Sequence, residues 1–196
     1  MKLYFTPGYC SLAVHIALRE AGARFELAKV DPTAASFREI NPRAYVPVLE
    51  LDDGSRHTEA AALLQYVGDL APNGALIPPA GTRDRFLVNQ ALTFISSELH
   101  KVFSPWLFHK ETAESTAKAL RDKLQARFAE LDAHFAKHDW FAANRFTVAD
   151  AYAFAILNWI PWVGMSTAKY PNLAAYVERV RSRPFVRAAL DAEGLK

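Results

Sequence analysis

The sequence lacks several features that would mark particular classes of protein. It contains a single cysteine, Cys10, so no internal disulfide can form, and this indicates a reducing compartment such as the cytosol. No charged leader followed by an apolar core and a cleavage site opens it. The formal net charge is only +2, and the lysines and arginines are scattered, so we expect no nucleic-acid partner.

Long hydrophobic runs are also missing. The longest apolar-rich stretch, residues 149–165, is interrupted by Asp150, Asn158 and Pro161 and is too short to span a bilayer comfortably. We expect a buried core helix there and no membrane contact. What the 196 residues do have is 51% hydrophobic content, enough for a sizeable core in one large domain or two small ones.

The first third of the chain alternates short strands with helices. An apolar run ends at Pro7-Gly8, and a helical pattern follows that stops before Gly22. Asp52-Asp53-Gly54 is typical of a hairpin turn. The expected strands are residues 2–6, 25–30, 45–49 and 55–58, and the expected helices are 11–21, 37–40 and 59–70. This order is βαβ-α-ββα.

Residues 71–81 hold three of the 11 prolines and two of the 8 glycines, which predicts a linker between domains. Everything after it is helical in pattern, including one long helix over residues 86–103 and another whose apolar stripe runs from Leu120 to Phe135. Thr147-Val148-Ala149-Asp150 has the form of a helix-capping motif at the start of the apolar helix. We place the domains at residues 1–74 and 83–196, joined by residues 75–82.

Cys10 stands beside Ser11, which we expect to be the N-cap of the first helix. Unpaired backbone N–H groups and the helix dipole stabilise an anion at such a position, so the thiol pKa is expected to be lowered. A lone cysteine is otherwise a small buried hydrophobe, and position alone leaves both interpretations open. Pro47 has two interpretations as well: the first residue of an edge strand, or a cis proline that turns the backbone toward a ligand.

The βαβ-α-ββα half, the linker and the helical half together resemble the glutathione S-transferase fold across the whole chain. Residues 4–12, Tyr-Phe-Thr-Pro-Gly-Tyr-Cys-Ser-Leu, resemble the active-site loop of the bacterial beta class, whose distinguishing residue is a cysteine where Cys10 stands. The resemblance implies a thioredoxin-like N-terminal domain, an all-helical C-terminal domain, glutathione as co-substrate and no metal. It also implies a cytoplasmic homodimer. By the same resemblance, Thr147 and Asp150 serve folding and not chemistry.

The resemblance also implies a glutathione site. Tyr45-Val46-Pro47-Val48-Leu49 resembles the cis-proline loop, in which the backbone of the residue matching Val46 pairs with the cysteinyl backbone of glutathione. Glu59 matches the residue that receives the α-ammonium end, with exposed N–H groups of the helix start facing the carboxylate. Ala60 departs from the family's usual serine, so one hydroxyl donor is missing.

Residues 95–101, Ile-Ser-Ser-Glu-Leu-His-Lys, resemble the beta-class helix that faces the active site. By this match His100 lies near the sulfur and acts there with Cys10 and Ser11. Glu98 and Lys101 reach toward glutathione, Glu98 in the partner subunit. The three fall within one helical turn and cannot all point the same way, which a split between two active sites would reconcile.

Two further departures concern the sulfur site and its surroundings. Phe5 replaces a tyrosine that many members have, and the segment after Asp31 lacks lysines that beta-class members often carry. Tyr9, Trp106 and Trp162 are expected to line the apolar pocket for the second substrate.

The predicted function is conjugation of glutathione to apolar electrophiles, with thiol-exchange or peroxide-reducing activity through Cys10 if it forms a mixed disulfide. The sequence leaves open whether Cys10 bonds the sulfur of glutathione or only lies beside it. The alternatives are a non-enzymatic binding or docking protein, which Ala60 and the shortened segment favour, and a glutathione-dependent isomerase or dehalogenase.

Overall fold

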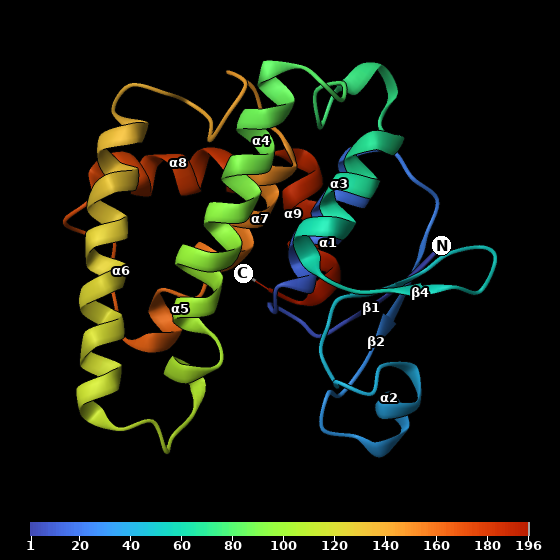
Figure 1. Ribbon diagram of the computed structural model, residues 1–196, viewed down its shortest axis with the longest axis horizontal. Coiled ribbons are helices and arrows are strands. Elements are labelled where there is room, and N and C mark those ends of the chain that lie inside the picture. Colours follow the sequence, from blue (N-terminus) through green and yellow to red (C-terminus); the bar gives the residue numbers. More distant parts are fainter. Residues whose placement is uncertain (196) are drawn as a thin grey trace.

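The computed structural model describes residues 1–195, and its N-terminal part has the predicted order of elements. A four-stranded sheet has the strand order β2-β1-β3-β4, in which β1 is parallel to β2 and all other pairs are antiparallel. The elements are β1 (Lys2–Phe5), α1 (Ser11–Glu20), β2 (Glu26–Lys29), α2 (Ala35–Ile40), β3 (Val48–Glu50), β4 (Arg56–His57) and α3 (Ala60–Leu70). Helices α1 and α3 lie between this sheet and the helical part of the molecule, and α2 lies at the opposite end of the sheet (Figure 1). The βαβ-α-ββα prediction is confirmed.

The strand bounds differ from those expected around the proline loop. We expected a strand over residues 45–49, but β3 begins only at Val48. Pro47 has no N–H to donate to a ladder, so pairing with β1 starts after it, at Tyr4 opposite Val48. The Val46–Pro47 peptide bond is cis, which agrees with the resemblance.

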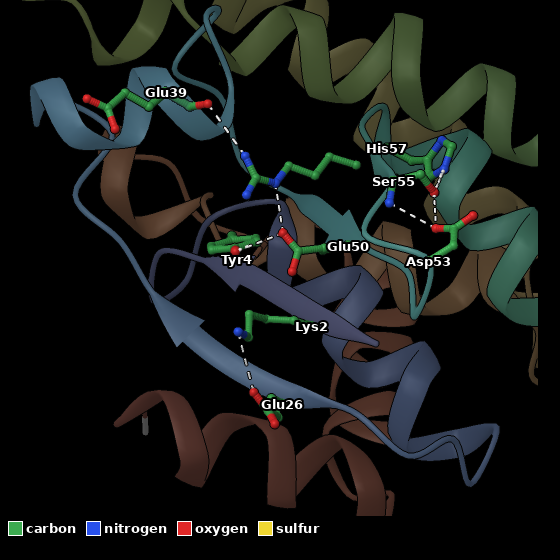
Figure 2. Close-up of polar contacts among 9 residues, drawn as sticks. Lys2, Tyr4, Glu26, Glu39, Glu50, Asp53, Ser55 and His57 are labelled. Carbon is green, nitrogen blue, oxygen red and sulfur yellow. Dashed lines mark hydrogen bonds and ion pairs between the residues drawn. The ribbon is translucent and has the colours of Figure 1, made fainter.

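Polar side chains tie together the strands on the face of the sheet that carries Tyr4. The Tyr4 hydroxyl donates to the Glu50 carboxylate at 3.1 Å, and Arg56 Nε donates to the same oxygen at 2.7 Å (Figure 2). Lys2 pairs with Glu26 across β1 and β2. Phe5 lies in the other cluster of the core, as strand alternation predicts. These contacts fix the sheet that carries the site.

The helical part begins after the short 3₁₀ turn Pro72–Gly74. We expected one α-helix over residues 86–103. The structure has α4 (Arg83–Phe94), capped by Thr82, then a π-helical segment (Ile95–His100) and the single turn α5 (Lys101–Phe103). The remaining helices are α6 (Glu114–Phe135), α7 (Val148–Leu157), α8 (Pro171–Arg181) and α9 (Pro184–Glu193). Helix α6 packs against α5, the π-helical segment and α8.

Helix α7 is the centre of the molecule. All ten of its residues are buried, which confirms the predicted core helix, and it packs against α1 and α3 on one side and α4 and α8 on the other. Thr147 and Asp150 form a capping box at its start. Asp150 also accepts a hydrogen bond from the backbone N–H of Phe141, so it supports the preceding turn as predicted. No helix within residues 1–195 is long and apolar enough to cross a membrane.

Candidate active site

The turn between β1 and α1 carries Cys10. Cys10 and not Ser11 is the N-cap residue of α1, so the predicted cap was wrong by one position. Ser11 is fully buried, and its hydroxyl lies 3.4 Å from the N–H and 3.3 Å from the carbonyl oxygen of Thr6. Because these contacts stay within the turn, Ser11 holds the loop that presents Cys10.

The Cys10 thiol is enclosed. Only 8% of the residue is exposed, and Sγ donates to the carbonyl oxygen of Val46 at 3.2 Å. Burial raises the pKa of the thiol to about 12, because desolvation outweighs the backbone N–H groups of the helix start and the charge of Lys101, which both lower the pKa. The expectation of a lowered pKa was therefore wrong for the unliganded protein, in which the thiol is protonated.

The proline loop and the start of α3 flank this thiol. Val46 is buried, whereas Tyr45 is exposed. Glu59 has a φ of 69°, a conformation that a non-glycine residue rarely adopts and that is often found at ligand-binding sites. Its carboxylate lies 3.4 Å from Arg43 Nη1 at the surface, and its charge acts on the pKa of Cys10. Ala60, the first residue of α3, is buried.

The π-helical segment points its polar side chains in different directions, as the spacing predicts. Glu98 pairs with Arg127 at 2.7 Å and with Lys123 at 3.2 Å, both on α6 of the same chain. His100 turns toward α7, where Nδ1 lies 2.7 Å from the Tyr152 hydroxyl. Lys101 is exposed, and its charge acts on both Cys10 and His100.

His100 sits in an aromatic surrounding. Its ring centroid is 5.1 Å from that of Trp159 and 5.8 Å from that of Tyr152. Burial, together with the Lys101 charge, lowers the pKa of the imidazole to about 4. The ring is therefore neutral at physiological pH and can offer a hydrogen bond but not a full positive charge.

Exposed aromatic side chains occur in the helical part and in the turn between β1 and α1. Phe108 contacts both Trp159 and Trp162, with centroid distances of 5.3 and 6.5 Å. Trp162, Trp106 and Tyr9, the predicted pocket residues, are each about half exposed. Trp162 also lines a cavity of about 580 Å³ that reaches Gly8.

The sequence did not predict a buried polar network that anchors the active-site turn at Gly8. Glu193 on α9 accepts the N–H of Gly8 at 2.9 Å, and its other oxygen lies 2.9 Å from His15 Nδ1. Arg19 Nε donates to His15 Nε2, so the proton of a neutral His15 is on Nδ1 and points at Glu193. Trp159 Nε1 donates to the Gly8 carbonyl at 2.7 Å. Both backbone groups of Gly8 are thus fixed by the helical part.

Comparison with known proteins agrees with this arrangement. A family model described as the glutathione S-transferase N-terminal domain matches residues 9–70, and one for the C-terminal domain matches residues 94–184. Glutathione S-transferase GstA of Escherichia coli O157:H7 is 38% identical over 202 residues, and the match covers 100% of both chains. The chain belongs to the glutathione S-transferase family. Its relatives are transferases, so the chain is assigned to an enzyme family as predicted.

Two solved glutathione S-transferases are close to this one in structure. A sphingomonad glutathione S-transferase, solved in complex with glutathione, is 43% identical with a TM-score of 0.93 over 100% of both chains. The beta-class glutathione S-transferase of Sphingomonas chungbukensis is 42% identical with a TM-score of 0.94, again over 100% of both chains. The predicted family resemblance is confirmed.

Two features explain why part of this transferase's site was not predicted. Tyr152 lies on an otherwise apolar helix, so the pattern indicates a core residue. Its hydroxyl is the one feature of the sequence there that could have indicated a polar contact with the site. Glu193 lies 185 residues from Gly8, and no local pattern links them. No group of His, Cys, Asp and Glu side chains within residues 1–195 could hold a metal ion.

Proposed function

We propose that this glutathione S-transferase conjugates glutathione to apolar electrophiles. The proposal rests on one observation: residues from the N-terminal and the C-terminal part of the chain act on the same thiol, that of Cys10. Cys10 Sγ contacts the Val46 carbonyl at 3.2 Å, and the charges of Glu59 and Lys101 both act on that thiol. We assign the glutathione half to residues 1–74 and the second-substrate half to residues 83–196, joined by residues 75–82. The separate matches of the two family models support this division.

Glutathione binds, in this proposal, along the proline loop. The backbone of Val46 pairs with its cysteinyl backbone, with Tyr45 and Pro47 shaping the loop. Glu59 receives its α-ammonium group, and the N–H groups at Ala60 and the next residues face its carboxylate. The positive charge of Lys101 attracts the anionic glutathione molecule. The unusual φ of Glu59 and the relative solved with glutathione support this binding mode.

The reacting atom is the sulfur of glutathione. Its thiol loses a proton to water, the thiolate attacks the electrophilic carbon, a carbon–sulfur bond forms and the leaving group departs with its electron pair. His100 stabilises the thiolate. The enclosed site also holds the reactants in position and stabilises the developing charge with fixed dipoles. The exposed aromatic residues Trp106, Trp162 and Tyr9 provide an apolar surface for the electrophile.

Cys10 is assigned a secondary role. Its raised pKa and its hydrogen bond to Val46 favour a protonated thiol beside the glutathione sulfur over a free nucleophile. Thiol exchange through a mixed disulfide is the second activity, limited by this protonation. Cys10→Ala is expected to retain most conjugation of a model aryl halide and to lose deglutathionylation. Loss of both activities would make Cys10 essential to conjugation.

A homodimer is part of the proposal. The side of α4 that carries Phe86 and Phe94 forms a groove of about 450 Å³, and Phe86 is exposed. A second copy of the chain would cover this apolar surface. Glu98 would have to leave Arg127 to reach the partner's glutathione. Sedimentation of the wild type and Phe86→Glu tests this assembly, since only the wild type is expected to sediment as a dimer. The single, enclosed cysteine supports a cytoplasmic location.

The proposal is tested by retention on immobilised glutathione, followed by turnover of an aryl halide. We expect retention, elution by free glutathione and glutathione-dependent turnover. Retention without turnover would favour a binding protein over an enzyme. Neither retention nor turnover would overturn the proposal.

A further inference from the structure

Tyr152 is a buried tyrosine whose hydroxyl reaches the sulfur site from α7. Only 2% of the residue is exposed. Its hydroxyl lies 2.7 Å from His100 Nδ1. The charge of a Cys10 thiolate or of Glu59 would raise its pKa, so the phenol lies within electrostatic reach of both. The site therefore has an aromatic hydroxyl although Phe5 has none.

His100 is the last residue of the π-helical segment. The N–H of Lys101 donates to the Ser96 carbonyl five residues back, so the turn is wider than in an α-helix. From this turn His100 faces Tyr152 on α7. Such π-helical insertions are frequent at functional sites.

The direction of this hydrogen bond follows from burial. The Tyr152 side chain is buried, and His100 Nδ1 is the one hydrogen-bond partner that its hydroxyl has within residues 1–195. A buried phenol has to donate its proton, so Nδ1 is the acceptor. A neutral imidazole that accepts at Nδ1 carries its proton on Nε2. Nε2 has no hydrogen-bond partner within residues 1–195.

We propose that Tyr152 is a positioning residue that fixes the Nε2–H tautomer of His100 and aims this proton donor at the sulfur of bound glutathione. The inference rests on the proposed function. A neutral donor suits a thiolate because the N–H stabilises the developed charge without itself losing a proton. Tyr152 need not touch glutathione, because it acts through the imidazole.

Tyr152→Phe removes only the hydroxyl. We expect the pKa of bound glutathione, followed by the ultraviolet absorbance of its thiolate, to rise by about one unit, and kcat/KM at neutral pH to fall about ten-fold. The KM for glutathione should change less than about two-fold, because glutathione does not contact Tyr152. In the free protein, ¹⁵N spectra of His100 should change from the Nε2–H tautomer to a mixture.

Three comparisons make the test specific. His100→Asn should lower kcat/KM as much as Tyr152→Phe or more, and the double variant should be no worse than His100→Asn alone, because Tyr152 acts through His100. Tyr176→Phe is the matched control: it also removes a buried phenol hydroxyl, which donates to Asp150, and should leave the tautomer and the thiol pKa unchanged. The third comparison needs no variant and applies even if Tyr152→Phe does not fold: the ¹⁵N spectrum of the wild type should show His100 with its proton on Nε2 and not on Nδ1.

The inference is overturned if His100 of the wild type carries its proton on Nδ1, if Tyr152→Phe leaves the tautomer unchanged, or if the effects of Tyr152→Phe and His100→Asn multiply. The proposed function would fail separately, through a wild type that neither binds nor turns over glutathione, since the tautomer is measured without substrate.

Discussion

Helix α7 carries one buried residue of each of two polar clusters, which differ in how completely their hydrogen bonds are made. In the capping cluster of Thr147, Asp150 and Tyr176, the Asp150 carboxylate accepts four hydrogen bonds, from two backbone N–H groups and two hydroxyls. In the sulfur-site cluster of Cys10, His100 and Tyr152, the imidazole Nε2 is left without a partner within residues 1–195.

This difference distinguishes polar groups that stabilise the fold from polar groups that are available to a ligand. A polar group whose partners are all supplied by the chain contributes stability and offers nothing to a ligand. A half-buried imidazole with one nitrogen unpaired can bind a molecule that supplies the missing partner. The two clusters are only two residues apart on α7, at Asp150 and Tyr152, so mutations in each can be compared in one fold.

The largest effect is expected from Asp150→Ala in the capping cluster. It leaves the N–H groups of Phe141 and Thr147 and the hydroxyl of Tyr176 without their acceptor. We expect a loss on the order of 3–5 kcal/mol in the free energy of unfolding, measured in urea. The folded fraction should keep its kcat/KM. A lower kcat/KM for folded protein would show that the two clusters are coupled.

Glu193→Ala is next, because Glu193 joins the structural and functional regions. Its loss unpairs the buried His15 Nδ1 and the N–H of Gly8. We expect about 2–4 kcal/mol less stability and a several-fold higher KM for glutathione, since the turn that presents Cys10 loses its anchor. Val186→Ala, buried on the same helix, is the control and should cost about 2 kcal/mol without changing this KM. Equal KM effects in both variants would contradict the anchoring role.

The pH dependence of stability distinguishes the clusters again. His100 is neutral in the folded protein, with a pKa of about 4, but takes up a proton near pH 6.5 when unfolded. The unfolded state thus binds more protons between these values, and the free energy of unfolding falls as the pH is lowered from 6.5 toward 4. We expect His100→Asn to remove roughly 2–3 kcal/mol of this fall. Asp150 titrates in both proteins, so the difference between them isolates His100. Parallel stability curves would contradict the lowered pKa.

The sequence predicts those parts of this fold that depend on neighbours along the chain. Hydrophobic alternation and turn residues give the βαβ-α-ββα order, and Thr147-x-x-Asp150 marks the start of α7. Local pattern also predicts that Glu98 and His100 diverge. Each of these features follows from a single hydrophobic periodicity or a single helix-capping motif. Such patterns suffice because hydrogen bonds within a helix or hairpin join residues that are close in the sequence.

The parts that could not be predicted depend on what folds against them. The position of Cys10 at a helix start predicts a lowered pKa, but the folded chain buries the thiol against Val46, and no local pattern reveals the resulting desolvation. The π-helical turn at Ile95–His100 has no clear signal in composition. Tyr152 lies in the stretch predicted as a core helix, and it is buried, but its hydroxyl contacts His100.

The smallest effect is expected from Arg43→Ala, at the open edge of the glutathione site. Its 3.4 Å contact with Glu59 is between two side chains that are each more than 70% exposed, so solvent screens the pair. We expect a change below about 0.5 kcal/mol in the free energy of unfolding. Arg85 is the matched contrast, since its guanidinium binds Asp69 with two 2.8 Å hydrogen bonds and is largely buried. Arg85→Ala should cost about 1–3 kcal/mol in the same urea titration. A loss above 1 kcal/mol for Arg43→Ala would mean that this side chain holds Glu59 in its positive-φ conformation. The Arg43–Glu59 pair would then stabilise the fold, as the capping cluster does.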